Sequence, residues 1–469
     1  MGIDYQPESS TIRTDVLIVG SGPIGAIYAR KLVEAGHKVL MVDAGAQETE
    51  IPGEHKKNVT DVTLNDFSSV IQNDLTPLSS SMPSAAATLA IGGMSTHWTC
   101  VTASPHPNLE APKLFSESKW NTLISEAQDL LHTNSTAFDA STRQDNLKNF
   151  LNASGHSFKS TPLACQKDEN GKVIYSSTAS ILSPILSSNN FTLLPRHLCT
   201  NLHKQNSKVT SALLTSLSTN SKISVVAEQY ILAAGAVLTP QIIYNSNMSQ
   251  ELPALGRYLT ERMVAFCQIK LDRKFSVDDG EVNIMQGVSE GKKWVTMINR
   301  EAHQYGQLPE DVDSGDVLDV RCMSVVEPNV ENRVEFGEKG SDGMPTPSFK
   351  VSPSNYDMKL AAKMMVEMQS LATTLGSFVT EPTIMPLGTA LHLSGTTRAG
   401  ESVETSVVDS NSKVWGVDNL YLGGCGVIAE GMACQPTLTA VGYALQSAEG
   451  VKTALSAELM FEVSKSRQY

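Results

Sequence analysis

The stretch Asp15-Val-Leu-Ile-Val-Gly-Ser-Gly-Pro-Ile-Gly25 decides the expected fold of this chain. Its apolar run, Val16 to Val19, is typical of a buried parallel strand. The glycines that follow have the G-x-G-x-x-G spacing: Gly20, Gly22 and Gly25. Apolar side chains then recur every three or four residues up to Gly36, and a second apolar run ends at Asp43. This order of strand, glycine-rich turn, helix, strand and acid predicts a Rossmann-type dinucleotide-binding unit.

The same turn predicts how a dinucleotide is held. The glycines allow a tight turn, close approach of a pyrophosphate and close contact between helix and sheet. Pro23 and Ile24 begin the helix, whose N-terminus would face the phosphates. Asp43 would accept a hydrogen bond from a ribose hydroxyl. This pattern by itself fits FAD and NAD equally.

Later strand patterns are expected to complete the cofactor sheet. They lie at residues 191–199, 222–226 and 230–233. The last of them runs into small residues, Ala234 and Gly235, where a sheet would return to the cofactor crevice. We therefore include Cys199, Ala234 and Gly235 among the candidate cofactor-binding residues. A fingerprint so near the N-terminus favours a flavoprotein.

The segment Ala90-Ile-Gly-Gly-Met-Ser-Thr-His-Trp-Thr-Cys100 indicates a ligand site of its own. Neither helical nor strand periodicity explains its composition. Glycine backbones approach a flat ligand closely and hydroxyls hydrogen-bond its edge. The candidates of this kind are Gly92, Gly93, Ser95, Thr96 and Thr99. His97 would offer a nucleophilic ring nitrogen beside the ligand. The alternative is a buried loop whose histidine is simply hydrogen-bonded.

Further stretches carry a family resemblance. They are residues 163–165 with 176–178, the run Ala-Gly-Ala-Val-Leu-Thr-Pro at 234–240, residues 253–260, and the stretch 392–448. On these the chain resembles the glucose–methanol–choline oxidoreductases, and within them the pyranose oxidases. The resemblance implies FAD as cofactor. It also implies an α/β fold, α+β overall, in which a Rossmann-like FAD-binding domain is interleaved with an antiparallel-sheet substrate domain, as in p-hydroxybenzoate hydroxylase-like proteins.

The resemblance assigns roles on both sides of the flavin. It implies that His97 is joined covalently to the 8α-methyl carbon, and that Thr99 lies near the N5/O4 edge. Gly424 belongs to a glycine-rich strand exit, and Pro436 and Thr437 open a helix whose N-terminus would face the pyrimidine ring.

His392 is implied as the catalytic residue opposite the flavin. A neutral imidazole, with a reference pKa near ~6.5, can take the hydroxyl proton of an alcohol while hydride leaves the adjacent carbon. On its own, His392 would be interpreted as a hydrogen-bonded core histidine. Gln435 stands where the pyranose oxidases have asparagine. Its amide is one methylene further from the backbone, so it predicts an altered pocket: a smaller sugar, a different carbon or a non-sugar alcohol.

Composition and charge narrow the class of protein. The chain has 469 residues and a net charge of −13, which argues against nucleic-acid and anionic-membrane partners. No run reaches the ~18 apolar residues of a membrane span. Seven scattered cysteines predict reduced core thiols, and the N-terminal residues lack the basic start and apolar core of a signal peptide. We expect a cytoplasmic protein.

The chain order predicts an interleaved domain arrangement. Residues 1–105, 155–262 and 386–469 would form the FAD-binding domain, and 263–385 the substrate domain with a helix over 359–375. Residues 106–154 are expected to be a linking surface segment, because a polar stretch with few apolar side chains begins at about Thr133 and runs to Ser160. A substrate loop is expected at Gln304–Asp316. The chain is shorter than the pyranose oxidases that it resembles, and the missing residues fall where those enzymes carry assembly arms. This difference favours a monomer or dimer.

Three functional classes stay open on the sequence. The first is oxidation of a sugar or glycoside at C2 or C3 to a ketone, with O2 reoxidising the flavin and giving H2O2. The second is a flavin dehydrogenase that uses a quinone or another acceptor on a specialised alcohol. The third is a flavoprotein lyase of the same fold.

Overall fold

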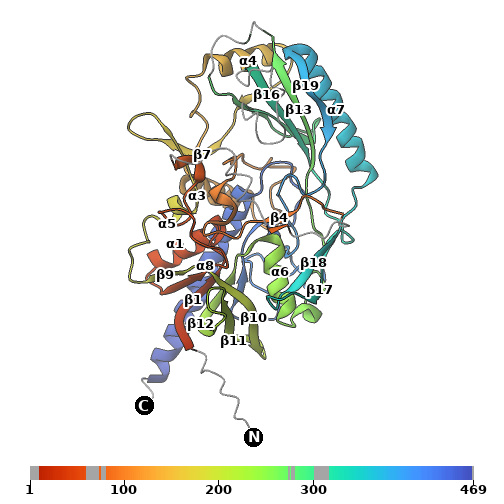
Figure 1. Ribbon diagram of the computed structural model, residues 1–469. Helices are drawn as coiled ribbons and strands as arrows, with labels where there is room; N and C mark the ends of the chain where they lie inside the picture. The colour runs from red at the N-terminus through yellow and green to blue at the C-terminus, as the bar shows by residue number, and fades with distance from the viewer. Residues whose placement is uncertain are drawn as a thin grey trace.

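The computed structural model describes residues 10–59, 73–74, 81–272, 275, 280–299 and 316–466, with side chains of the last helix described to residue 457. One unit is built around a mostly parallel sheet and the other around an antiparallel sheet (Figure 1). The chain passes between them repeatedly, so the predicted α/β architecture with interleaved units is confirmed. The expected substrate loop lies outside the described residues except for Asp316.

The first sheet has seven strands in the order β10-β11-β12-β1-β2-β9, with β20 paired to β12. Their bounds are β1 (Ser10–Val19), β2 (Val39–Val42), β9 (Phe191–Leu194), β10 (His197–Gln205), β11 (Lys208–Ser216), β12 (Lys222–Leu232) and β20 (Leu420–Leu422). β1 runs parallel to β2 and β12, and β20 is parallel to β12. The two strands expected at 222–226 and 230–233 are one continuous strand, β12. The single run expected at 191–199 is divided at Pro195 and Arg196, the latter with φ 57°.

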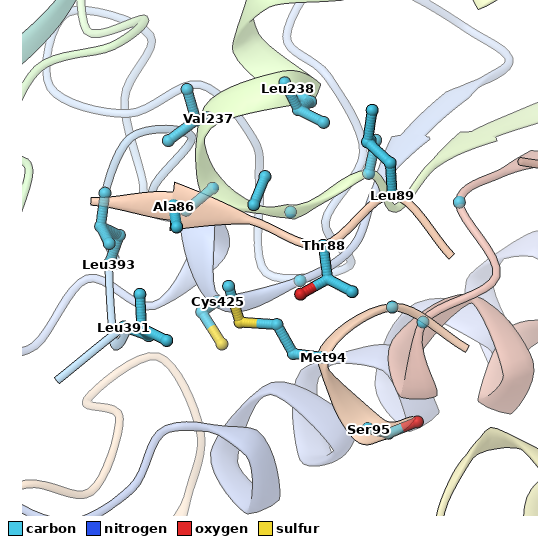
Figure 2. Close-up of a pocket in the computed structure, with 18 of the residues that line it drawn as sticks. Ala86, Thr88, Leu89, Met94, Ser95, Val237, Leu238, Leu391, Leu393 and Cys425 are labelled. Atoms are coloured by element: carbon cyan, nitrogen blue, oxygen red, sulfur yellow. The ribbon is translucent and has the colours of Figure 1, made fainter. Parts of the chain in front are cut away.

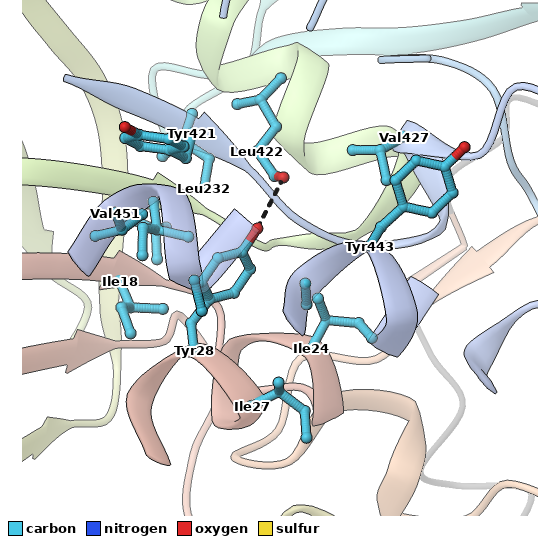
Figure 3. Packing of buried hydrophobic residues seen from close by; sticks show 14 of the residues in the cluster. Ile18, Ile24, Ile27, Tyr28, Leu232, Tyr421, Leu422, Val427, Tyr443 and Val451 are labelled. Carbon is cyan, nitrogen blue, oxygen red and sulfur yellow. Dashed lines mark hydrogen bonds between the residues drawn. The ribbon is translucent and has the colours of Figure 1, made fainter. Parts of the chain in front are cut away.

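Helix α1 (Pro23–Glu34) joins the two ends of the chain. It begins with Pro23 at its first position, as the sequence predicts, and buries Ile24, Ile27 and Tyr28. In Figure 3 Ile24 and Tyr28 point toward α8 (Thr437–Ser466), and the Tyr28 hydroxyl donates to the Leu422 carbonyl of β20 at 3.3 Å. The C-terminal segment is therefore part of the N-terminal core.

The second sheet has six strands in the order β19-β13-β16-β15-β14-β6, all antiparallel. Their bounds are β6 (Lys159–Ser160), β13 (Met263–Leu271), β14 (Asn283–Gln286), β15 (Trp294–Asn299), β16 (Val317–Ser324) and β19 (Gly376–Ile384). Helix α7 (Asn355–Leu375) covers one face with Leu360, Met364, Met368 and Leu371 buried. It begins four residues before the predicted Lys359, because Ser354 and Asp357 form a capping box.

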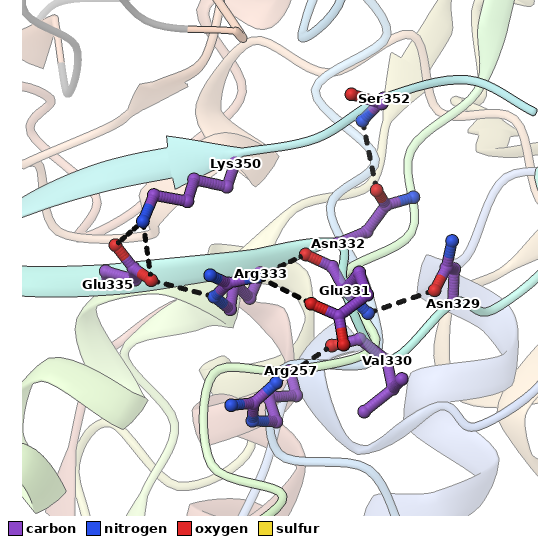
Figure 4. A network of polar contacts seen from close by, with 9 residues as sticks. All are labelled: Arg257, Asn329, Val330, Glu331, Asn332, Arg333, Glu335, Lys350 and Ser352. Atoms are coloured by element: carbon purple, nitrogen blue, oxygen red, sulfur yellow. Dashed lines mark hydrogen bonds and ion pairs between the residues drawn. The ribbon is translucent and has the colours of Figure 1, made fainter.

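A hairpin of β17 (Arg333–Lys339) and β18 (Pro345–Lys350) stands apart from both sheets. Residues 333–336 lie within the segment expected as the substrate domain, but among the described residues they pair with β18 and, through Arg333, with Arg257, and not with the second sheet. The Gln241 side chain on α6 (Gly235–Asn245) donates to the Pro345 carbonyl at 2.8 Å. Glu335 pairs with Arg333 of the same strand and with Lys350 across the hairpin (Figure 4).

Residues 106–154 differ from the expected surface segment. They contain α3 (Glu117–Leu130), which packs on α8 with Trp120 and Tyr443 in an edge contact at 5.9 Å. They also contain α4 (Thr142–Ala153), whose Leu147 and Leu151 are buried in the core of the second unit. A few apolar side chains at a spacing of four are enough to bury one face of an otherwise polar helix.

Short elements complete the fold. They are α5 (Thr178–Leu182), β3 (Asn73–Asp74), β4 (Ala86–Ala87), β5 (Thr133–Asn134), β7 (Leu163–Lys167), β8 (Val173–Tyr175), and the 3₁₀ turns η1 (Lys56–Asn58), η2 (Gly93–Thr96), η3 (Ser249–Glu251) and η6 (Cys425–Val427). None of the helices that the structure describes combines the length and apolarity needed to cross a bilayer.

Candidate active site

A cavity of about 1850 Å³ lies between the carboxyl ends of β1 and β2 and the second unit. This exceeds the roughly 300–1,000 Å³ typical of small-molecule pockets, so it can hold a dinucleotide with a substrate beside it. Figure 2 shows part of the lining: Thr88 and Leu89 after β4, Met94 of η2, Val237 of α6, and Cys425 of η6.

Most of the predicted site residues line this cavity, although they come from all parts of the chain. Those that do are Gly20, Gly22, Pro23, Ile24, Asp43, Gly93, Ser95, His97, Thr99, Cys199, Ala234, Gly235, His392, Gly424, Gln435, Pro436 and Thr437. Gly25, Gly92 and Thr96 do not line it. They lie behind the wall, where the Thr96 hydroxyl donates to the Gly93 carbonyl at 2.9 Å.

The glycines divide into packing positions and open positions. A Cβ on Gly25 would lie 2.0 Å from the Gly20 carbonyl oxygen, so Gly25 allows α1 to contact the turn. A Cβ on Gly22 or on Gly235 would meet nothing within 4 Å, and both residues line the cavity. Bare backbone therefore faces open space at the N-termini of α1 and α6. This arrangement fits the flat, anionic shape of FAD.

Ser21 links three segments at the base of the cavity. Its hydroxyl donates to Asp43 Oδ2 at 2.7 Å and accepts from the Gly92 N–H at 2.9 Å. Its carbonyl accepts from the Thr178 hydroxyl at 3.0 Å. Asp43 also accepts from the Ser21 and Gly45 N–H groups; burial raises the pKa of Asp43 and these hydrogen bonds lower it. The acid expected to bind ribose is thus already held by the turn that it faces.

His97 is buried at the cavity wall as a neutral base. Its Nε2 lies 2.9 Å from the Thr88 hydroxyl. Burial, and then the charge of Lys56, lower the pKa of His97 to about 4. The backbone beside it is held by His55, whose Nε2 lies 2.9 Å from the Trp98 carbonyl oxygen. One ring nitrogen therefore carries a lone pair at neutral pH.

His392 and Gln435 share the cavity wall near the second unit. Among the described residues neither His392 Nδ1 nor Gln435 Oε1 has a hydrogen-bond partner, although both atoms are buried. Gln435 Nε2 donates to Met297 Sδ at 3.1 Å. Burial, followed by the charge of Arg262, holds the pKa of His392 well below its usual range. Buried polar atoms without partners cost free energy, and they are typical of sites completed by a ligand.

Sequence reasoning missed several residues that support the site. Ser21 sits inside the glycine motif, and Thr178 lies in a stretch used only for the family resemblance. Glu261 and Arg262 directly follow the resembling run 253–260, so their position was the available signal. Thr88 has no local pattern around it, and only the fold brings it to His97.

Comparison with known proteins agrees with this geometry. Two GMC oxidoreductase models match residues 125–264 and 328–444, and an FAD binding domain model matches 13–64. A pyranose 2-oxidase of Emericella nidulans is 32% identical over 94% of this chain and 92% of its own. A C-glycoside 3-oxidase of Microbacterium trichothecenolyticum is 27% identical over 95% and 98%. The crystal structure of pyridoxine 4-oxidase from Mesorbium loti shares the fold, with a TM-score of 0.66 at 14% identity over 93% and 99%.

Proposed function

This chain belongs to the GMC oxidoreductase family, and we propose that it oxidises a secondary alcohol of a sugar or glycoside, at C2 or C3, to the ketone. It is an FAD-dependent oxidoreductase that acts on CH–OH donors. The observation that carries the proposal is the pairing of His392 with Gln435 on one wall of the dinucleotide cavity, each with a buried polar atom that lacks a partner.

His392 is the proposed general base. Because its pKa is held well below the usual value, the imidazole is neutral at physiological pH and can accept the hydroxyl proton of the substrate. Losing that proton makes the adjacent C–H bond a better hydride donor.

Gln435 orients the substrate in this proposal. Its Nε2 is engaged by Met297, which leaves the carbonyl oxygen to accept a hydrogen bond from a substrate hydroxyl. Sugars carry several neighbouring hydroxyls, so a second one can bind Gln435 while the first donates its proton to His392.

When bound, FAD supplies the hydride acceptor, and O2 then takes the two electrons with two protons to give H2O2. Bare backbone at Gly22 and Gly235 accommodates the cofactor, and Asp43 accepts from its ribose. We assign the covalent attachment to His97, whose neutral ring has the lone pair that the new C–N bond needs. One C–H bond of the 8α-methyl group would break, and its hydrogen and that of the imidazole N–H would leave as protons. The two electrons would pass to the flavin ring, from which O2 would take them with two protons to give H2O2.

Anaerobic stopped-flow spectroscopy tests the proposed function. The purified protein is mixed with D-glucose, D-galactose, D-xylose and their methyl and phenyl glycosides, and bleaching of the flavin band is followed. We expect at least one sugar to bleach the band, air to restore it, and His392→Ala to abolish bleaching while the flavin stays bound. Bleaching of His392→Ala at the parent rate would refute the base assignment.

Two further outcomes decide the rest of the proposal. Recovery with a quinone but not with air would replace the oxidase by a dehydrogenase, and no bleaching by any alcohol in the panel would contradict the reaction. His97→Ala should release yellow colour into the supernatant on acid precipitation, whereas the parent keeps it in the pellet. Release from the parent as well would contradict the covalent attachment.

A further inference from the structure

Two adjacent buried residues, Glu261 and Arg262, hydrogen-bond to the backbone N–H and carbonyl of His392. The Glu261 carboxylate accepts from the His392 N–H at 3.2 Å, and the Arg262 guanidinium donates to the His392 carbonyl through Nη1. Both residues are only 2% exposed. Glu261 also accepts from the N–H of Arg262 at 2.7 Å, which fixes the carboxylate beside the guanidinium.

The same guanidinium reaches the segment that carries Gln435. Arg262 Nη2 donates to the Cys434 carbonyl at 3.0 Å. From the other side, Glu110 Oε1 accepts from the Ala433 and Cys434 N–H groups at 2.7 and 3.0 Å. The planar fork of arginine therefore spans the backbones of both catalytic candidates, which a single ammonium group cannot do.

The backbone next to His392 is strained. Leu391 has φ 57°, the left-handed region that costs a branched L-residue free energy. Such a conformation persists only where surrounding contacts impose it. The contacts that flank it are those of Glu261 and Arg262 on His392, together with the hydrogen bond from the Leu391 N–H to the Gly388 carbonyl at 3.0 Å.

We propose that Glu261 and Arg262 are positioning residues, which hold the backbone of His392 next to the strained Leu391 and set the place of His392 relative to Gln435. Neither would touch the substrate; each acts through the backbone that it binds. The inference rests on the proposed function for its catalytic meaning, but the geometry that it assigns is a property of the chain alone.

Arg262 has a second consequence for His392, because it is a cation buried beside it. The other described titratable groups that interact electrostatically with Arg262 or its neighbours are Glu261, Cys425, Cys434 and Glu110. Burial raises the pKa of both thiols, so they are uncharged near neutral pH. Removing the Arg262 charge should therefore let His392 be protonated more easily.

Histidine NMR tests this without any substrate. The holoenzyme is labelled with ¹³C at the ε1 position of its 10 histidines, and the His392 signal is assigned by its loss in His392→Gln. Between about pH 5 and 8 we expect no titration of His392 in the parent. In Arg262→Gln we expect a larger protonated fraction of His392 at the acidic end of this range than in the parent, because one of the two causes that lower its pKa is removed. Arg262→Lys keeps the cation and should behave as the parent does.

Kinetics with D-glucose provide the second arm. Arg262→Lys should lower kcat about 10- to 100-fold, because one ammonium group cannot hold both carbonyls in place, with KM changed less than about threefold. Arg321→Lys is the matched control: Arg321 is also 2% exposed, but it pairs with Asp319 in β16 and is not one of the described residues that line the cavity. It should leave kcat and the His392 signal unchanged even where the melting temperature falls.

Two results would overturn the inference: a protonated fraction of His392 that is no larger in Arg262→Gln than in the parent, or a kcat in Arg262→Lys equal to that of Arg321→Lys. If neither D-glucose nor any other sugar of the panel reduces the flavin of the parent protein, the proposed function is wrong. The NMR comparison would then still decide whether Arg262 controls His392.

Discussion

Replacing Ser21 with alanine removes one hydroxyl that serves the glycine turn, the ribose-binding acid and the His97 segment together. The hydroxyl donates to Asp43 at 2.7 Å and accepts from the Gly92 N–H at 2.9 Å. Ser21 is 0% exposed, so water cannot replace these contacts without opening the turn. The variant therefore tests whether this buried network supports the fold.

The expected cost follows from the groups left behind. A hydrogen bond to a charged group contributes about 1.5–3 kcal/mol, and a buried donor without a partner costs about 1–3 kcal/mol. Asp43 Oδ2 keeps its bond from the Ser21 N–H at 2.7 Å, which limits the first contribution. We expect Ser21→Ala to lower the free energy of unfolding by about 2–4 kcal/mol.

Urea unfolding of the parent and variant, followed by circular dichroism, measures this difference. The control is Ser456→Ala, whose exposed hydroxyl donates to the Lys452 carbonyl; it should stay within about 0.5 kcal/mol of the parent. A loss below about 1 kcal/mol in Ser21→Ala would mean that the network is not a structural support, and the reasoning would be refuted.

Three further predictions concern the turn and the His392 backbone. Gly22→Ala should keep the fold, because the φ of −59° suits alanine, but it should lose visible flavin absorbance, because the new Cβ would enter the cavity. Gly25→Ala places a Cβ 2.0 Å from the Gly20 oxygen, so its free energy of unfolding, measured by thermal melts, should fall by about 1–3 kcal/mol. Equal stability of these two variants would contradict the assignment of Gly22 as open to the cavity and of Gly25 as packed against the turn. Burial raises the pKa of Glu261 from 4.5 to about 7. The folded state therefore binds this proton more tightly than the unfolded state does. As pH rises from 4.5 to about 7, the free energy of unfolding of the parent falls by up to ~3 kcal/mol. The urea midpoint of Glu261→Gln, relative to that of the parent, should therefore rise as pH increases from 4.5 to about 7. A difference in midpoint that stays constant over this range would contradict the raised pKa of Glu261. Leu391→Gly relieves about 1–2 kcal/mol of left-handed strain but removes a half-buried side chain. The free energy of unfolding should therefore change by less than about 1 kcal/mol, while kcat falls. An unchanged kcat would show that the strained backbone does not position His392.

The sequence predicts most of the cofactor half, because its signals are local. Strand, turn and helix follow one another within residues 16–34, and each glycine is needed by its immediate neighbours. The helix at 359–375 was predicted for the same reason, from side chains at helical spacing. The misplaced parts depended on distant partners: α4 joins the second core, and β17 pairs with β18 alone among the described strands, and neither outcome is encoded in local periodicity.

By itself, then, the sequence determined the dinucleotide fold and the residue types of the site, since spacing and side-chain chemistry are readable along one segment. How the site is held depends on contacts that form only when distant segments pack together. The fold placed Thr88 on His97, Met297 on Gln435, and Arg262 across the backbones of His392 and Cys434. These contacts join residues far apart in the chain, and the shifted pKa of His392 follows from burial and a nearby cation, which exist only once the chain has folded.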